Sequence, residues 1–464
     1  MQVKRGARRS EAYVTATRQL HVGYTCRWVK AASFDHQSLL ILSTDEVFKG
    51  PFRLLVTSAT LIDRSHPRQR AMSTYQLTHL ETGEQVERPG ILLNPHLKPA
   101  GKERHGVDPS VEAYHAQLPQ YGSTTLHSLP SVAHELGFAH VFLKDESTRF
   151  GLPSFKILGA SWAVHRALCS RLDLDASTTT LERVKHALAS RESTDVRLVT
   201  CTEGNWGRAV SRMAKYYAIP ATIYVPGFMN EYTRSLIRAE GADVKVLDDG
   251  SYDDTIAAVQ QDTKTHPEAL MVMDTSWPGY IEIPGWVTEG YSTLMTEVDR
   301  QVSAQTNGAS LPVLAVASVG VGSWAHSVVS HYHTSSPGHA SNKIVTVESI
   351  AAACLKESLH CGDITPIRTG HTIMNGMNCG TPSTIAWPVL RDGVYAAVTV
   401  NDRESHGCVQ ELQALDANAG PCGAATLAAL RKVCNEEMIG EEERKGMCVV
   451  LFSTEGRQEY DVPT

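Results

Sequence analysis

The residue with the clearest potential for covalent chemistry is Lys156, which lies where a loop gives way to a helical pattern. Gly151 and Pro153 precede it, and apolar residues recur at helical spacing after it, so we expect Ser154 as the N-cap and Lys156 in the first turn. The positive end of the helix dipole disfavours a cation there, and burial would also favour the neutral amine. Only a neutral amine attacks an aldehyde, so the position suits a lysine that forms a Schiff base. A solvated lysine beside a loop is the ordinary alternative.

A glycine-bearing turn at 320–323 is the candidate anion site. It follows the continuous apolar run 311–318, which has the length of a strand buried on both faces, and it precedes an apolar helical pattern. Backbone N–H groups at the start of such a helix can bind a phosphate. Taken alone, the pattern is more commonly explained by a glycine turn that serves only packing.

A scaffold must bring these segments together, and the pattern of the chain predicts one. Strand-like runs alternate with helical patterns over short connections, which predicts an α/β fold with a doubly wound parallel sheet. Ligands bind such sheets at the carboxyl ends of the strands. We expect a smaller α/β domain at 195–290, inserted between two parts of a larger domain at 106–194 and 291–464. The expected strands are 140–143, 197–201, 221–225, 244–247, 270–273, 311–318, 343–347, 394–400 and 448–452.

The composition is that of a soluble globular protein. The 464 residues are 42% hydrophobic and 20% charged, and the net charge of −7 provides no general attraction to nucleic acid or to an anionic membrane. No apolar run is long enough to span a membrane. The ten cysteines include no pair or Cys/His grouping at metal-binding spacing, so we expect no metal site. Cys201, Cys379 and Cys422 lie near apolar or glycine-rich segments, which favours reduced packing residues.

Residues 1–105 are predicted to be an N-terminal extension of unknown role. The first thirty residues contain seven Lys or Arg and one acid, Glu11, a composition typical of a mitochondrial transit peptide or of a disordered basic tail. The alternating segments 52–62 and 75–80 are candidate strands. We otherwise expect a cytoplasmic protein.

Two overlapping stretches resemble a known family. Ser154-Phe155-Lys156 with Gly159-Ala160 is similar to the S-F-K-x-x-G-A signature of the tryptophan-synthase-β-like enzymes, which use pyridoxal 5′-phosphate (PLP). The longer KDESTRFGLPSFKILGA, at 144–160, resembles the diaminopropionate ammonia-lyases among them. The resemblance covers about residues 107–460. It implies the fold of a type II PLP enzyme, with the smaller domain inserted in the larger, and a homodimer.

The resemblance also implies which residues hold PLP. Lys156 would carry the cofactor, Asn205 would approach the ring hydroxyl, and Thr454, within an S-T-E-G motif, would face the pyridine nitrogen. Without the family, the asparagine would be interpreted as a helix cap and the threonine as part of a turn. His326 stands where the family usually has a small residue. The phosphate would bind the turn, which is similar to the family's A-G-V-G-A-M-A loop and here consists of Gly320, Val321, Gly322 and Ser323.

Two acids correspond to the family's proton-transfer residues. Asp274, in MDTSWPGY, matches the acid assigned to the α-proton of the L-amino acid, although a lone Asp after a strand is more often a helix cap. Glu203, in TEGNWGR, stands where the family has an aspartate that serves the D-isomer. It is one methylene longer, and Trp206 replaces the family's histidine, so this half of the site departs from the pattern.

The resemblance therefore implies α,β-elimination of ammonia from 2,3-diaminopropionate, giving pyruvate and ammonia. Residues 372–380, within the glycine-rich segment 369–382, are similar to the family's T-I-M-A-G-L-x-C-G loop, which closes over a small amino-acid substrate. Two alternatives within PLP chemistry stay open: a dehydratase that acts on serine or threonine, and a β-replacement synthase. A third alternative is a catalytically silent PLP-binding or scaffold protein.

Overall fold

The computed structural model describes residues 38–42, 59–63, 73–100, 108–190, 196–250, 252–334 and 341–464. The chain forms two compact units, Met1–Ala71 and Met72–Thr464. In the first unit, β1 (Ser38–Leu42) pairs antiparallel with β2 (Ala59–Asp63). β2 confirms the end of the predicted strand segment 52–62, whereas residues 52–58 and the basic first thirty residues lie outside the described part of the chain.

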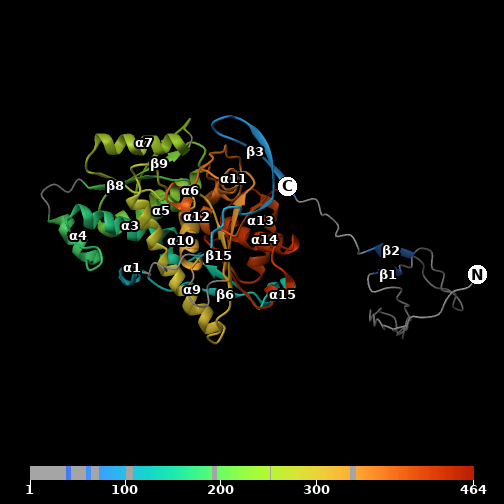
Figure 1. The fold of residues 1–464 in the computed structure, drawn as a ribbon. Coiled ribbons are helices and arrows are strands. Elements are labelled where there is room, and N and C mark those ends of the chain that lie inside the picture. Colours follow the sequence, from blue (N-terminus) through green and yellow to red (C-terminus); the bar gives the residue numbers. More distant parts are fainter. Residues whose placement is uncertain are drawn as a thin grey trace, which may run out of the picture. The chain divides into compact units, whose positions relative to one another are not determined.

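The second unit is built around a mixed seven-stranded sheet (Figure 1). Its five inner strands are parallel, and the two edge strands run antiparallel to their neighbours. The inner strands are buried along almost their whole length, as expected when helices cover both faces. In spatial order the strands are β5 (Ile91–Leu93), β14 (Ala396–Val400), β13 (Lys343–Ser349), β12 (Val313–Ser318), β15 (Cys448–Ser453), β7 (His140–Asp145) and β6 (Leu126–Ser128).

Alternation along β12 explains how the two faces are covered. Ala315 and Ala317 point into the hydrophobic cluster that includes α10 (Ser323–Tyr332), and Leu314 and Val316 point into the cluster that includes α14 (Pro421–Asn435). Successive side chains of a strand point to opposite faces, so these two helices lie on opposite sides of the sheet.

A second sheet contains four parallel strands, all between residues 197 and 271. α5 (Asn205–Tyr217) and α7 (Tyr252–Thr265) cover its opposite faces, because Leu198 packs in the cluster with α5 and Val199 packs in the cluster with α7 (Figure 1). The strand order is β10 (Asp243–Leu247), β9 (Ala221–Pro226), β8 (Arg197–Cys201) and β11 (Ala269–Met271).

The predicted α/β class is confirmed, and each expected strand after residue 109 has a counterpart within about three residues at either end. The proposed domain boundaries stay a prediction. Part of the predicted extension nevertheless belongs to the second unit: β3 (Thr74–Thr78) and β4 (Gln85–Pro89) form a hairpin, and β5 pairs with β14 at the edge of the large sheet. The expected strand at 75–80 corresponds to β3.

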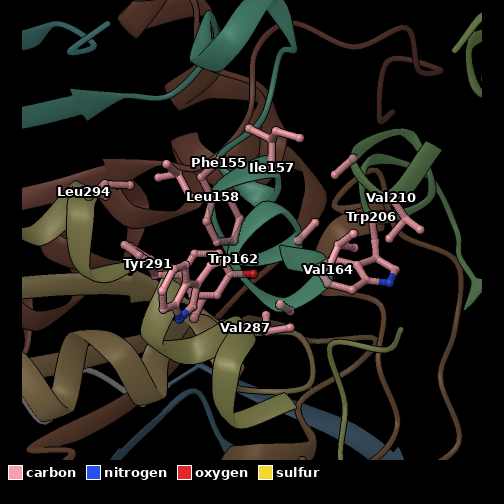
Figure 2. Packing of buried hydrophobic residues seen from close by; sticks show 14 of the residues in the cluster. Phe155, Ile157, Leu158, Trp162, Val164, Trp206, Val210, Val287, Tyr291 and Leu294 are labelled. Carbon is pink, nitrogen blue, oxygen red and sulfur yellow. The ribbon is translucent and has the colours of Figure 1, made fainter. Parts of the chain in front are cut away.

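Helix α3 (Lys156–Arg171), which begins at the candidate lysine, packs closely against α8 (Glu282–Gly290). Leu158 and Trp162 of α3 meet Val287 and Tyr291 at this crossing, and all four are buried (Figure 2). The remaining helices are α1 (Pro109–His115), α2 (Pro130–Leu136), α4 (Leu181–Ala189), α6 (Glu231–Ala239), α9 (Ser292–Gln305), α11 (Cys354–Cys361), α12 (Ala386–Gly393), α13 (Asp402–Ala414) and α15 (Glu441–Arg444), with 3-10 turns at Arg149–Gly151 and Asn375–Met377.

The state of the cysteines and the character of the helices were also predicted from the sequence. Cys201 and Cys422 are buried free thiols, and Cys379 is a half-buried free thiol. In the part of the chain that the structure describes, none of the helices combines the length and apolar character needed to cross a membrane.

Candidate active site

A cavity of about 930 Å³ lies at the carboxyl ends of β8, β12 and β15. This is where ligands bind parallel sheets, because the loops that follow the strands converge there. The cavity brings together residues from segments that are more than a hundred positions apart. The nine candidate site residues line it: Lys156, Glu203, Asn205, Asp274, Gly320, Val321, Gly322, Ser323 and Thr454.

Lys156 and Asp274 form the polar pair at the centre of this cavity. Lys156 Nζ lies 2.5 Å from Asp274 Oδ2, and Asp274 is almost fully buried. The helix start differs slightly from the prediction: Phe155 occupies the N-cap position, and Ser154 Oγ accepts a hydrogen bond of 3.3 Å from the backbone N–H of Lys156. Lys156 is thus the first residue of α3.

The protonation of Lys156 is set by competition between burial and its partner. Burial by itself lowers the pKa of the amine, but the Asp274 charge and hydrogen bond outweigh it, so the pKa of Lys156 is raised above its ordinary value. Burial thus acts on the amine in the predicted direction, but the carboxylate of Asp274 reverses the net effect and favours the charged form. The sequence could not reveal the carboxylate that lies beside the amine, 118 residues further along the chain.

The glycine turn is shaped to receive an anion at the start of α10. Gly322 occupies the N-cap position with φ of +96°, a conformation that favours glycine, and no side chain caps the helix. A Cβ on Gly320 would lie 2.8 Å from the carbonyl oxygen of Gly376 and 3.1 Å from Cys379 Sγ. The first-turn N–H groups of a helix have no partner within the helix, so they are available to a phosphate.

Asn205 and Thr454 lie on other walls of the same cavity. Asn205 is the first residue of α5, and its Nδ2 donates a hydrogen bond of 3.2 Å to Glu455 Oε2. Thr454 follows β15 directly, is buried, and has its Oγ1 3.5 Å from Ser318 Oγ. The carbonyl oxygen of Thr454 accepts a hydrogen bond of 3.2 Å from the backbone N–H of Phe155, which ties the end of β15 to the start of the lysine helix.

Glu203 and Trp206, the two departures from the family pattern, follow β8. Glu203 is half-buried and lines the cavity, and it lies close enough to Cys379 to help burial raise the pKa of that thiol to about 12. Trp206 is buried, and its Nε1 donates a hydrogen bond of 2.9 Å to Thr200 Oγ1. The centroid of the Trp206 ring lies 5.8 Å from Lys156 Nζ, which is within cation–π distance, so the indole attracts the charged form of the amine.

Comparison with known proteins decides the family. Residues 118–453 match the model of the family described as pyridoxal-phosphate dependent enzyme. The chain belongs to the family of pyridoxal-phosphate dependent enzymes. Its cofactor is therefore pyridoxal 5′-phosphate, as predicted.

Similar proteins within this family include diaminopropionate ammonia-lyases. The enzyme from Salmonella typhimurium is 36% identical over 299 residues, which cover 64% of this chain and 73% of the relative. The Escherichia coli enzyme is 30% identical over 356 residues, covering 74% and 86% respectively. A crystal structure of the E. coli enzyme in complex with D-serine has a TM-score of 0.70 at 27% identity, covering 83% of this chain and 95% of that one. The predicted resemblance to this branch of the family is confirmed.

The residues of the cavity fit the cofactor of the family. One cavity contains an amine, a glycine turn in which Gly320 has no room for a Cβ, and a half-buried carboxamide. The amine suits the aldehyde of the cofactor, the turn suits its phosphate, and the carboxamide suits its ring hydroxyl.

The cavity also contains residues that were not among the candidate site residues predicted from the sequence. Asn375–Cys379, within the predicted substrate loop, line the cavity, and so do Glu455 and residues 457–460 of the C-terminal tail. Tyr460 Oη lies 2.9 Å from His406 Nδ1 of α13, which holds the tail against that helix. The S-T-E-G motif was a signal for Glu455, but the polar tail carried none.

The charged residues before Lys156 have a structural role. Arg149 is fully buried and bonds Glu146 at 2.8 Å and Glu297 at 2.7 Å. Lys144 Nζ donates a hydrogen bond of 2.9 Å to Glu297 as well. Because each ion has an opposite partner, the network fixes β7 and the loop that leads to α3.

Proposed function

We propose that this protein catalyses the α,β-elimination of ammonia from 2,3-diaminopropionate. With one water consumed, the products are pyruvate and two molecules of ammonia. The observation that carries the proposal is the Lys156–Asp274 pair, an amine and a carboxylate 2.5 Å apart in a cavity that also contains a glycine turn for phosphate. The similarity to two diaminopropionate ammonia-lyases supports the choice of substrate.

Four groups of the chain hold the cofactor in this proposal. Lys156 binds its aldehyde, the turn Gly320–Ser323 binds its phosphate, Asn205 faces the ring hydroxyl and Thr454 faces the ring nitrogen. When bound, PLP supplies the electron sink for the charge that develops at the α-carbon. A neutral hydroxyl such as that of Thr454 does not keep the ring nitrogen protonated, which suits elimination better than transamination.

Asp274 takes the α-proton of the L-substrate. Its carboxylate lies within hydrogen-bond distance of Lys156 Nζ, so a proton can pass between the two groups at that point. Glu203 serves the D-isomer from the carboxyl end of β8. Its side chain is one methylene longer than the aspartate of the family, and placement of a base matters at the level of an ångström. We therefore expect the L-isomer to be the better substrate.

The β-amino group then leaves as ammonia after accepting a proton, and the C–N electron pair goes with it. The unsaturated product is released and hydrolysed by water to pyruvate and the second ammonia. The residues of the 369–382 loop that line the cavity, Asn375–Cys379, exclude bulk water from the α-carbon while the substrate is bound.

A second candidate reaction is dehydration of serine or threonine. The observations that favour it are Glu203 and Trp206, which change the shape of the cavity beside Lys156 relative to the family pattern. A β-replacement synthase would trap the unsaturated product with a nucleophile and release no keto acid. A silent scaffold would bind PLP and transform none of these substrates.

We further propose that the protein works as a homodimer in the cytoplasm. The support is the resemblance to the family, together with the bacterial origin of the two relatives described above. Sedimentation of the purified protein would test the homodimer.

The test offers L- and D-2,3-diaminopropionate, L-serine and L-threonine separately and follows keto acid and ammonia. Pyruvate from the L-diamine with two ammonia per turnover is the expected result. Asp274→Asn should lower the rate with the L-isomer by about 10²- to 10⁴-fold, and Glu203→Gln should affect the D-isomer instead. Protein that is yellow with PLP but inactive toward the diamines would refute the proposed substrate.

A further inference from the structure

Glu455 is a buried acid in the active-site cavity to which the proposed mechanism gives no role. It follows Thr454 at the end of β15, is 3% exposed and lines the cavity. Burial raises the pKa of its carboxyl, an effect opposed by hydrogen bonds from Cys422 and by the charge of Lys156. A carboxylate is costly to bury, so its contacts must offset that cost.

The contacts of Glu455 come from three separate parts of the chain. Oε1 accepts a hydrogen bond of 3.2 Å from the backbone N–H of Cys422, in the first turn of α14. Oε2 accepts one of 3.2 Å from Asn205 Nδ2 and another from Gln458 Nε2 in the C-terminal tail. All three partners are donors. An ionised carboxylate offers only acceptors, so it is the form that satisfies every contact at once.

This arrangement determines how the Asn205 side chain is oriented. A carboxamide has a donor end and an acceptor end of nearly the same shape, and nothing in its own structure selects which end faces the cavity. Glu455 does select, because a carboxylate oxygen attracts the NH₂ group and repels the carbonyl oxygen. The second N–H of Asn205 then stays available for an acceptor within the cavity.

We infer that Glu455 is a positioning residue for the cofactor, acting through Asn205 by fixing the donor end of its carboxamide. The inference rests on the proposed function in so far as Asn205 faces the ring hydroxyl. The contact also links the loop after β15 of the seven-stranded sheet to α5, which packs on the four-stranded sheet.

The informative variant is Glu455→Gln, which keeps the size of the side chain but replaces one acceptor oxygen with a donor. The backbone N–H of Cys422 cannot turn over, so the new NH₂ takes the place of Oε2, where Asn205 and Gln458 must each present a carbonyl. We expect PLP affinity, measured by equilibrium dialysis of the purified protein, to fall by about 10- to 100-fold. The absorbance maximum of the bound cofactor should shift as well, because the hydrogen bond at its ring changes.

A double-mutant cycle separates positioning from a merely structural role. Asn205→Ala should weaken PLP binding by itself, and Glu455→Gln added to it should cause no further loss, because the group that Glu455 orients is already absent. Losses that multiply in the double variant would overturn the inference. Glu348→Gln is the matched control: Glu348 is also a fully buried acid that accepts two backbone N–H groups, but it does not line the cavity. It should lower stability and leave the cofactor absorbance unchanged.

If Glu455→Gln fails to fold, Asn205→Asp tests the same contact from the other side. It places a carboxylate against Glu455, so PLP binding should be weaker than in Asn205→Ala; equal binding would overturn the inference. These readouts do not use the substrate. Failure of the wild-type protein to release pyruvate from 2,3-diaminopropionate would therefore refute the proposed function and leave this test in place.

Discussion

Substitution of Gly159 by alanine tests how closely the lysine helix must approach its neighbour. Gly159 lies where α3 crosses α8, about one turn after Lys156. An added Cβ would lie 2.7 Å from Tyr291 Cζ and 2.8 Å from Val287 Cγ1, and both neighbours are buried. Carbon atoms in contact are normally separated by about 3.5–4.0 Å, so the two helices must move apart by roughly 1 Å.

The expected cost follows from two opposing effects. Overpacking a buried contact of this kind costs about 1–3 kcal/mol, and the rigid partners here favour the upper part of that range. Alanine is favoured over glycine in a helix interior by about 1 kcal/mol. The free energy of unfolding should therefore fall by about 2 kcal/mol in Gly159→Ala. A displacement of Lys156 by about 1 Å should also lower kcat on the order of 100-fold.

Gly285→Ala provides a matched control on the partner helix. Gly285 lies inside α8, and no atom within 4 Å would meet its Cβ, so only the gain in helix propensity of about 1 kcal/mol applies. Urea denaturation of the two variants should thus differ by about 3 kcal/mol. If Gly159→Ala proves as stable and as active as Gly285→Ala, the close crossing does not position Lys156 and the reasoning is wrong.

Three further predictions concern the cofactor, pH and the buried ions. Gly320→Ala should weaken PLP binding at least 10-fold in equilibrium dialysis, because its Cβ would meet the Gly376 carbonyl at 2.8 Å; unchanged affinity would place the phosphate elsewhere. His115 is buried and neutral, since burial lowers its pKa to about 3, so the folded state loses stability as pH falls below the ordinary value of 6.5. Between pH 6.5 and 5 this loss is about 2 kcal/mol, and His115→Gln should remove it from the pH dependence of urea denaturation; an identical slope would refute it. Arg149→Met removes the guanidinium that both Glu146 and Glu297 contact, and it should lower the free energy of unfolding by about 3–5 kcal/mol in the same assay. A loss below about 1 kcal/mol would show that the network contributes little to stability.

Much of the fold followed from local pattern. Runs such as 197–201 and 343–347 alternate with amphipathic helices, and β8 and β13 occupy these positions because the apolar side chains there are buried on both faces. The glycine turn before α10 was predictable for the same reason, since a strand, a turn and a helix in succession form a local unit. The resemblance around Lys156 led to the family, which the comparisons then confirmed.

The short edge strands were not predictable in the same way. β5 and β6 have three residues each, too few for a periodic signal, and they exist because β14 and β7 offer unpaired backbone groups at the edges of the sheet. Backbone pairing of β5 with β14 therefore joins the N-terminal part of the second unit to the large sheet. The side-chain pattern of β5 is too short to predict this pairing.

The sequence by itself determined the longer elements, the family and the chemical types of the groups in the site, because each depends on residues that are close together in the chain. The tertiary structure decided the contacts between them. Asp274 raises the pKa of Lys156 only because the fold places its carboxylate 2.5 Å from the amine. Glu455 reaches Asn205, 250 residues away in the chain, for the same reason. Electrostatic and hydrogen-bond energies depend on distance in space, and strand order, which local pattern does not encode, sets that distance.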